Sequence, residues 1–486
     1  MKKIYVSIIA LALISISGCK KFLEQPPDQR TEVNTVEKVA ELLTSAYPEA
    51  NYIPFTESAS DNAEDKGPTV GREPREVVMP FYWKDNDDRG RDTPTFYWNS
   101  CYEAIAAANA ALVAIDKASD QTPYLPYKGE ALVARAYAHF MLVTLFAKGY
   151  DPATADSSPG IPYVTEPEKV VSAKYTRGTV ASVYAAIEKD LLAGLPLLKN
   201  SAYKVPKYHF NVAAANAFAA RFFLFKKEYE KVIKYVDAVS SGNSFAPLIR
   251  PWNTIYKTNT FEEQEIKFTQ ATQVPTLLLI ETASLWARTN NPRYGFGQEL
   301  TNQMFANNVT GARWAYKSAY TSVPHYSTLK WNEYFVKTSQ NATIGFPYTI
   351  VPVFTADEAL LNRAEAYAQI GNFNAALADL NTFCSTRILD YNAAAYAVTL
   401  EKIKDYYGLA DPKAGLIATV LDFKKKEFTQ EGLRWFDIIR HKIPVKHKVY
   451  AINGSFTTIE LPADDPRRLF QLPTQVSLSG IQQNPR

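Results

Sequence analysis

The chain has 486 residues and a formal net charge of +3 at pH 7, with 47% hydrophobic and 21% charged residues. A charge so close to zero gives no electrostatic basis for binding nucleic acid, which we exclude as a partner. The sequence contains no Walker loop, no G-x-S-x-G and no G-x-G-x-x-G motif, and its five histidines form no H-E-x-x-H pair. We predict no catalytic residue, no metal site and no cofactor. Cys101 and Cys384 lie far apart without metal-ligand spacing, so we expect buried thiols, with one disulfide as the alternative.

The N-terminal residues have the order of a bacterial lipoprotein leader. Lys2 and Lys3 precede an apolar run over residues 4–16. This run is too short to cross a bilayer, because a spanning helix needs about 20 apolar residues. It ends in the sequence Ile-Ser-Gly-Cys at residues 16–19, which matches the lipobox at which a signal peptidase cleaves before an acylated cysteine.

From the lipobox we predict a signal peptide over residues 1–18, lipidation of Cys19 and a lipidated tether over residues 19–31. Two prolines at residues 26–27 extend and stiffen the tether, which keeps the folded body clear of the membrane. Cleavage removes two lysines and no acid, which lowers the formal charge from +3 to +1, so we expect only the lipid to hold the protein on the membrane. The alternative is a secreted soluble protein in which Cys19 is incidental.

Residues 358–382 have the spacing of a tetratricopeptide repeat, in which two helices pack side by side. Gly371 is expected to end the first helix, because glycine readily adopts the left-handed conformation common at that place. Phe373 opens the second helix, and Ala376 is small because the two helices cross there.

Two further stretches resemble this pair less closely. In residues 211–241, Lys227 replaces the turn glycine and Val232 replaces the crossing alanine, and a looser pair spans residues 95–146. Repeats separated by about a hundred residues cannot stack through adjacency in the sequence. We therefore predict a mainly α fold: tetratricopeptide-like helix pairs in one large helical body with long ligand-binding loops and a few short strands. Residues 326–354 are candidates for those strands.

The helix expected within residues 422–442 carries charges of alternating sign at every third position. These residues are Glu431, Arg434, Asp437 and Arg440. This spacing places the side chains along one side of the helix, so we predict an exposed ladder of ion pairs, with Trp435 packed inward. Exposed pairs add little stability, and we interpret the ladder as architectural rather than catalytic.

Several of these segments occur together, and in this order, in one known family. They are the lipobox followed by CKKFLEQPP, the helix carrying Trp98, Tyr102, Ile105 and Asn109, the segment ARAYAHFMLVTLFAKGY, the repeat LLNRAEAYAQIGNFNAALADLN and the segment EFTQEGLRWFDIIRH. The chain resembles the SusD/RagB family over essentially its whole mature length. The combination is far more specific than any one of its parts.

The resemblance implies a fold, a partner and a location. Members are outer-membrane lipoproteins of Bacteroidetes that combine tetratricopeptide helix pairs with a loop-rich half. They cap a SusC-like TonB-dependent barrel and capture a glycan, or a peptide in RagB-like members, for import. We accordingly expect one SusD-like domain over residues 32–486, with parts at about 32–240 and 260–486, lipid-anchored and facing the cell exterior. Residues 240–340 match no member of known specificity, so the identity of the ligand does not carry over.

Ligand contacts are expected on loops outside the helix pairs, because loops on a rigid scaffold commonly carry recognition. Residues 60–100 combine tryptophans with hydrogen-bonding side chains, which suits a sugar, since its apolar face stacks on a ring while polar groups bind its hydroxyls. The candidates here are Asn62, Asp65, Arg72, Trp83, Trp98 and Asn99. Charged neighbours of Trp83 predict that it is exposed. Trp98 and Asn99 resemble contacts of starch-binding members by position, although Trp98 also suits a core position at a helix start.

A second stretch, residues 285–320, adds Tyr294 and Trp314 as ligand-binding candidates and Trp286 as a weaker one. Glycines on both sides of Phe296 indicate a loop in which these rings would form the other wall of a binding arc. The competing interpretation is a buried segment over residues 277–286.

Three classes of function remain open at the level of sequence. The favoured class is a non-enzymatic glycan-binding lid on a transporter, and the second is a peptide-binding lid or a protein-interaction scaffold without a sugar ligand. The third is a glycoside hydrolase, which needs two carboxylates at a characteristic separation that the acidic loop over residues 85–92 could supply. Release of reducing ends from oligosaccharides distinguishes the hydrolase from the other two.

Overall fold

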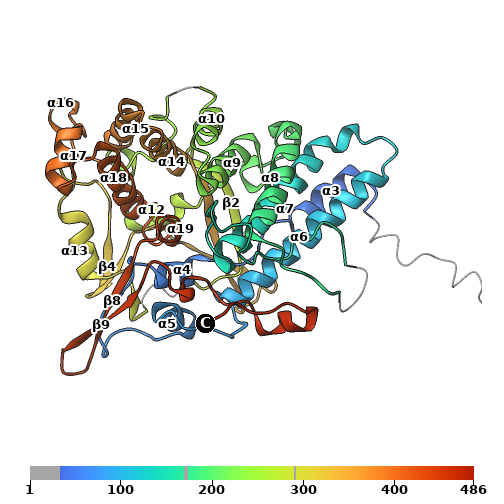
Figure 1. The fold of residues 1–486 in the computed structure, drawn as a ribbon, viewed down its shortest axis with the longest axis horizontal. Coiled ribbons are helices and arrows are strands. Elements are labelled where there is room, and N and C mark those ends of the chain that lie inside the picture. The colour runs from blue at the N-terminus through green and yellow to red at the C-terminus, as the bar shows by residue number, and fades with distance from the viewer. Residues whose placement is uncertain (1–32, 169–172, 243, 289–291) are drawn as a thin grey trace, which may run out of the picture.

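The computed structural model describes residues 33–168, 173–242, 244–288 and 292–486 (Figure 1). Its long helices follow one another in pairs from right to left in Figure 1, and neighbouring pairs are in contact. The pairs are α6 (Pro94–Lys117) with α7 (Leu125–Phe146), α9 (Val212–Lys226) with α10 (Tyr229–Val239), and α14 (Ala356–Gln369) with α15 (Phe373–Ser385). Helix α8 (Val180–Gly194) packs on α7, while α17 (Leu400–Tyr407) and α18 (Pro412–Glu427) lie beyond α14. The predicted mainly α fold is confirmed.

The turns inside two of these pairs form where the sequence predicts them. Helix α14 ends at Gln369, Gly371 has a φ of 83°, and α15 begins at Phe373. Between α9 and α10, Lys227 takes the same left-handed conformation with a φ of 64°. Its backbone N–H donates to the Leu224 carbonyl at 3.2 Å, which closes the helix end even without a glycine.

Ala376 is fully buried in the α14–α15 pair, as the helix-crossing interpretation requires. Leucine at this position would force extra volume into a filled interface, so we expect Ala376→Leu to lower the free energy of unfolding by about 1 to 3 kcal/mol. Thermal and urea unfolding measure the change. Ala378 is exposed on the same helix, and Ala378→Leu is the matched control. Equal melting curves for the two variants would contradict the crossing.

Short helices and strands fill the lower half of the view in Figure 1 and the edges of the helical body. The short α-helices are α3 (Val36–Leu43), α4 (Ile53–Ala59), α5 (Arg75–Phe81), α11 (Ile255–Thr258), α12 (Phe261–Phe268), α13 (Gln298–Ala306), α16 (Ala393–Tyr396) and α19 (Leu433–Arg440). The 3-10 helices are η2 (Thr122–Tyr124), η3 (Leu195–Leu197), η4 (Asn200–Ala202), η5 (Pro206–Tyr208), η6 (Pro466–Arg468) and η7 (Thr474–Ser479).

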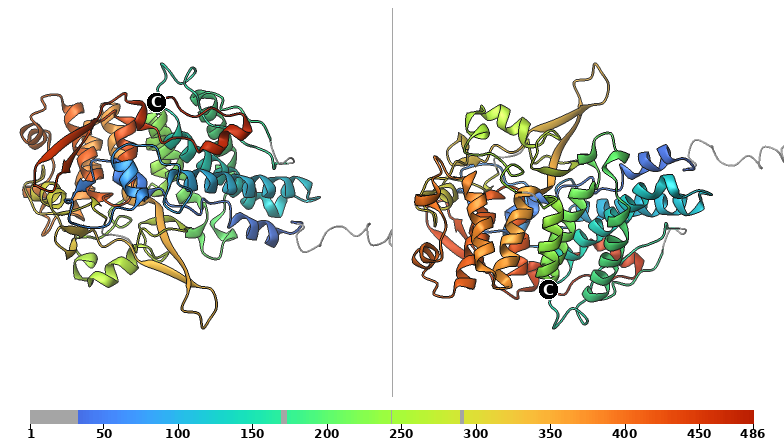
Figure 2. Two further views of the ribbon diagram at one scale, coloured as in Figure 1. Left: turned by 90° about the horizontal axis from the view of Figure 1, so that it is seen from below. Right: turned by 90° about the horizontal axis from the view of Figure 1, so that it is seen from above.

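All strand pairs in the described residues are antiparallel. The strands are β1 (Glu64–Asp65), β2 (Thr276–Thr282), β3 (Tyr294–Gly295), β4 (Ala319–Ser322), β5 (His325–Ser327), β6 (Glu333–Lys337), β7 (Gly345–Thr355), β8 (Val445–Tyr450) and β9 (Phe456–Leu461). Strands β2, β7 and β6 form a three-stranded sheet in that order, and the others pair as β1–β3, β4–β5 and β8–β9. Figure 2 shows the β6–β7 hairpin projecting away from the body.

One hydrophobic cluster extends through the helical body and reaches from Val39 to Ile481. Cys101 and Cys384 are buried and free, as predicted. Within the part of the chain that the structure describes, no helix has the length and hydropathy needed to cross a membrane. The predicted signal peptide, Cys19 and tether lie outside the described residues.

The predicted exposed ion-pair ladder is wrong. Glu431, Arg434, Asp437 and Arg440 are all buried or nearly so, and only Asp437 and Arg440 pair with each other, at 2.7 Å. The other partners come from distant segments: Lys330 for Glu431, Asp61 for Arg434 and Glu365 for Arg440. The reason is that α19 packs against α4 and α18, so its polar side chains mostly contact residues of other elements rather than one another.

Candidate ligand-binding site

Strands β1 and β3 bring the two predicted ligand-binding stretches together. Glu64 pairs with Gly295 and Asp65 with Tyr294 in antiparallel register, although the two strands are more than two hundred residues apart. An isolated bridge between Arg72 and Pro292 extends this contact. The loops after α4 and after β2 therefore form one surface, as the sequence interpretation assumed.

Asp65 holds this surface together. Its carboxylate accepts from Arg293 Nε at 2.6 Å and Nη2 at 2.7 Å, and from the backbone N–H of Tyr450 at 2.8 Å. Arg293 also donates to Glu73 at 2.7 Å. Asp65 is only 4% exposed, so its oxygens accept hydrogen bonds within the protein and are not accessible to a ligand hydroxyl.

Trp83 is buried, and the expectation that it is exposed is wrong. Its ring is 5% exposed, stacks on His447 with centroids 4.7 Å apart, and donates Nε1–H to the Ala59 carbonyl at 2.9 Å. Phe81 stacks on the same imidazole at 4.1 Å. His447 lies on β8 and is brought here by the tertiary fold, so the charged neighbours of Trp83 in sequence gave no sign of this contact.

The other three candidate rings are also interior. Tyr294 is 3% exposed and stacks on Phe81 at 4.3 Å, Trp98 packs edge-on against Phe146 at 4.9 Å, and Trp314 packs edge-on against Phe423 at 5.3 Å. Because a sugar stacks on an open ring face, these rings form no exposed platform in this conformation. For Trp98 the structure favours the core position at the helix start.

Asn62 and Tyr294 line a small cavity together with Glu57, Trp286 and Gln430. Its volume of about 20 Å³ has room for a single water molecule and not for a sugar ring. Asn62 is 2% exposed. The candidates that solvent reaches are the exposed Arg72 and the half-buried Asn99, whose Oδ1 accepts from Gln475 at 3.3 Å.

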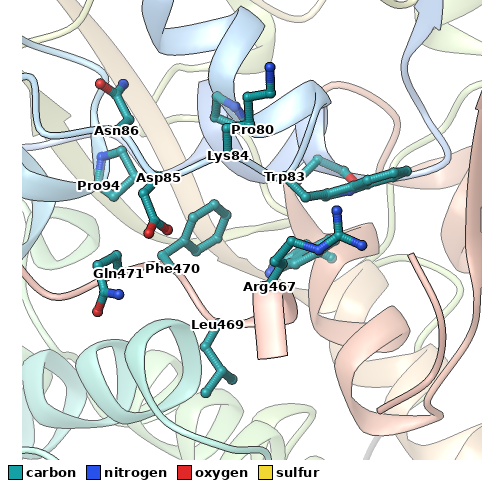
Figure 3. A pocket seen from close by; sticks show the side chains of 12 residues that line it. Pro80, Trp83, Lys84, Asp85, Asn86, Pro94, Arg467, Leu469, Phe470 and Gln471 are labelled. Atoms are coloured by element: carbon teal, nitrogen blue, oxygen red, sulfur yellow. The ribbon is translucent and has the colours of Figure 1, made fainter. Parts of the chain in front are cut away.

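A second small cavity lies beside Trp83 (Figure 3). The polar ends of Asp85, Gln471 and Arg467 surround the rings of Trp83 and Phe470 there. The cavity volume is again about 20 Å³, far below the several hundred cubic ångströms of a typical ligand pocket. Asp85 is bound to Arg486 at 2.6 Å, which ties the loop at one rim to another part of the chain.

Three carboxyl groups beneath this surface have raised pKa values. Burial raises the pKa of Glu57 to about 7, that of Glu64 to about 7 and that of Asp92 to about 6. Glu64 accepts from the backbone N–H of Leu300 at 2.6 Å, which opposes the shift without cancelling it. Neither these three nor any other three His, Cys, Asp or Glu side chains of the described residues gather as metal ligands would.

The fold and this surface define a class of helical proteins that present loops on a paired-helix scaffold. Residues 21–224 match a family model described as starch-binding associating with outer membrane, and residues 252–471 match the model of the SusD family. The chain belongs to the SusD/RagB family, as its motifs predicted. Members of this family are binding proteins rather than enzymes. Among curated proteins, no sequence matches the chain significantly.

Solved structures share this fold at low sequence identity. A putative sugar binding protein from Bacteroides vulgatus has a TM-score of 0.71 and 20% identity, and covers 94% of this chain and 99% of its own. A SusD superfamily protein from Bacteroides thetaiotaomicron has a TM-score of 0.63 and 20% identity, with coverages of 93% and 100%. A laminarin binding SusD-like protein has a TM-score of 0.60 and 14% identity, with coverages of 93% and 98%.

Proposed function

We propose that this protein is a cell-surface lipoprotein that captures an oligosaccharide and caps a SusC-like TonB-dependent barrel for import, without catalysing a reaction. The observation that carries the proposal is the family match: residues 21–224 match the model described as starch-binding associating with outer membrane, and residues 252–471 match the model of the SusD family. The laminarin binding neighbour supports a glycan ligand. We assign residues 32–486 to one SusD-like domain, with its two parts at about 32–240 and 260–486, and place it outside the outer membrane.

Binding to a glycan array tests the glycan ligand. We expect retention of at least one glycan without release of reducing ends, and binding that changes little with added salt, because neutral sugars offer no ionic contact. Release of reducing ends would make the protein a hydrolase. A protein that retains no glycan in the presence or absence of its barrel would instead support the peptide-binding lid or the protein scaffold.

One observation favours a macromolecular partner at the β6–β7 hairpin. Its side chains Tyr334, Ile344 and Phe346 are 46%, 71% and 50% exposed, and the hairpin projects from the body (Figure 2). Exposed apolar side chains of this size commonly mark contact surfaces. The hairpin suits a contact with the barrel, and it equally suits the peptide or protein ligand of the second candidate function.

Lipid anchoring is tested at Cys19. Because acylation needs the thiol, Cys19→Ala is expected to abolish labelling by a radioactive fatty acid and to leave the protein unprocessed or mislocalised. Labelling and membrane fractionation of both forms measure this. A Cys101→Ala variant is the control, since that thiol is buried. Equal labelling of the Cys19→Ala variant and the unmodified protein would overturn the lipoprotein assignment.

A further inference from the structure

A cleft of about 500 Å³ lies next to the small cavity of Figure 3, and Leu469 lines both. The cleft is bounded by the C-terminal ends of α9, α14 and α19, by the loop after α7 and by residues 463–469. Its size falls within the range of sites that bind small molecules, about 300 to 1,000 Å³. In this structure the cleft can hold a saccharide without rearrangement, which the two 20 Å³ cavities beneath the loops cannot.

Two tyrosines in the cleft wall keep part of their rings open to solvent. Tyr150 and Tyr229 are both half-buried, in contrast to the interior rings of the loop surface. Tyr150 is supported from behind by Tyr184, with ring centroids 4.7 Å apart. Neither hydroxyl has a hydrogen-bond partner among the described residues. Each tyrosine therefore offers an apolar ring and a free hydroxyl, which is the combination that a pyranose needs.

Most charged side chains around the cleft already have partners: Arg440 binds Glu365, Lys442 binds Asp464, and Asp465 binds Arg467. Lys148, Lys227 and Arg468 have no carboxylate within ion-pair distance in the described chain, and Arg468 instead donates to backbone carbonyls such as that of Ile438, at 2.6 Å. Asp151 has no cationic partner there. Because few charged side chains at the cleft lack a partner, the cleft has little preference for an ion over a neutral ligand.

His441 adds a hydrogen-bonding nitrogen to the wall. Its Nε2 lies 2.9 Å from Glu365 Oε1. Burial alone would raise the pKa of Glu365, but the charges of Arg440 and Lys424 outweigh it and hold the pKa well below its usual range. Glu365 is therefore ionised and can only accept, so Nε2 carries the proton. The other ring nitrogen of His441 has no partner in the described residues and is left for a ligand hydroxyl.

We propose that this cleft is a second saccharide site, which binds a neutral sugar chain by stacking on Tyr150 and Tyr229 and by hydrogen bonds to the side chains around them. Its saccharide class rests on the proposed function, whereas its position rests on the volume, the open rings and the small number of unpaired charges described above. The site is separate from the loop surface around Asp65 and Arg72.

The test compares cleft variants with a matched surface variant. We expect Tyr150→Ala and Tyr229→Ala each to weaken binding of the retained glycan about tenfold, as for a stacked hot-spot ring. The glycan array contains starch and laminarin fragments and acidic glycans, and calorimetry measures the affinity. Thr154 is exposed at the cleft, and Thr154→Trp fills the space without removing a packed ring. Tyr406→Ala removes an exposed tyrosine on α17, away from the cleft, and should leave glycan affinity unchanged.

The outcomes separate this inference from the proposed function. Loss of affinity in Thr154→Trp and in either tyrosine variant, with unchanged melting temperature, supports the cleft. If the unmodified protein binds a neutral glycan and all three variants bind it equally well, the cleft proposal is overturned and the proposed function stands. If no glycan binds, both are overturned. Preferential binding of acidic glycans that is abolished by salt would overturn the neutral class of ligand.

Discussion

Arg387→Ala is expected to lower the free energy of unfolding by about 3 to 5 kcal/mol, the range found when one partner of a buried ion pair is removed. Arg387 is fully buried and donates to Glu427 through Nε at 3.1 Å and through Nη2 at 2.9 Å. The same guanidinium binds Asp357 on α14. Removing it leaves two buried carboxylates without their shared cation, which is the physical cause of the large loss.

The network around Arg387 joins distant parts of the chain. Tyr316 donates to Glu427 at 2.5 Å and Trp252 Nε1 donates to it at 3.3 Å. Burial raises the pKa of Glu427, but Arg387 outweighs this and holds the value at about 2, so Glu427 stays charged at neutral pH. Without Arg387, burial of Glu427 is no longer outweighed and its pKa rises, so the variant must either keep an unpaired buried charge or protonate this carboxylate.

The matched control for Arg387 is Arg288. Arg288 also binds one glutamate through two nitrogens, with Nε–Oε2 at 2.5 Å and Nη2–Oε1 at 2.7 Å to Glu333, but it lies in solvent. Exposed pairs contribute little, so Arg288→Ala should leave the urea midpoint almost unchanged. If both variants lose the same stability, burial is not what makes the Arg387 network important.

Glu57→Gln is expected to stabilise the protein at pH 8 by about 3 kcal/mol relative to its effect at pH 4.5. Glu57 is 5% exposed, and burial raises its pKa from the ordinary 4.5 to about 7, although its carboxylate accepts a hydrogen bond from the Gly432 N–H at 3.1 Å. Between pH 4.5 and pH 8, a folded-state pKa of about 7 in place of 4.5 corresponds to about 3 kcal/mol in the free energy of unfolding. The folded state holds the proton more tightly than the unfolded state. This contribution is complete below pH 4.5 and is lost as the pH rises through 7.

Urea unfolding of the Glu57→Gln variant and the unmodified protein from pH 4.5 to pH 8 measures this effect. Glutamine keeps the shape and the acceptor oxygen of Glu57 but has no charge to bury, so the difference between the two proteins should grow with pH. The same substitution at Glu230, which is exposed on α10, is the control. A stability difference for Glu57→Gln that is equal at both pH values would show that its carboxyl does not titrate in this range.

Local sequence patterns were sufficient for the helical scaffold. The periodicity of residues 358–382, the glycine at Gly371 and the small Ala376 specify a helix, a left-handed turn and a crossing helix, each from residues a few positions apart. Such features depend on backbone conformation and on neighbours within one or two helical turns. The same holds for Cys101 and Cys384. Their spacing suits no metal site, which predicted buried thiols, and both are buried and free.

The environment of the candidate ligand residues could not be found in this way. Trp83 lies among charged residues in sequence, yet its ring is covered by His447, which follows it by more than three hundred positions. Asp65 has the chemistry of a sugar ligand but is bound to Arg293, 228 residues away. A sequence shows which chemical groups a side chain can bind, but it does not show which distant residue contacts that side chain in the folded protein.

The sequence by itself therefore determined the family, the mainly α architecture and the position of its turns, and it predicts a lipid anchor at Cys19. Only the tertiary structure decided that the candidate rings are buried, that the charges of α19 pair with other elements, and that three helix ends enclose a cleft with open tyrosines. The physical reason is one of range. Helices and turns are stabilised by hydrogen bonds and packing between near neighbours, whereas burial, ion pairing and cavity shape depend on which remote segments come into contact when the chain packs.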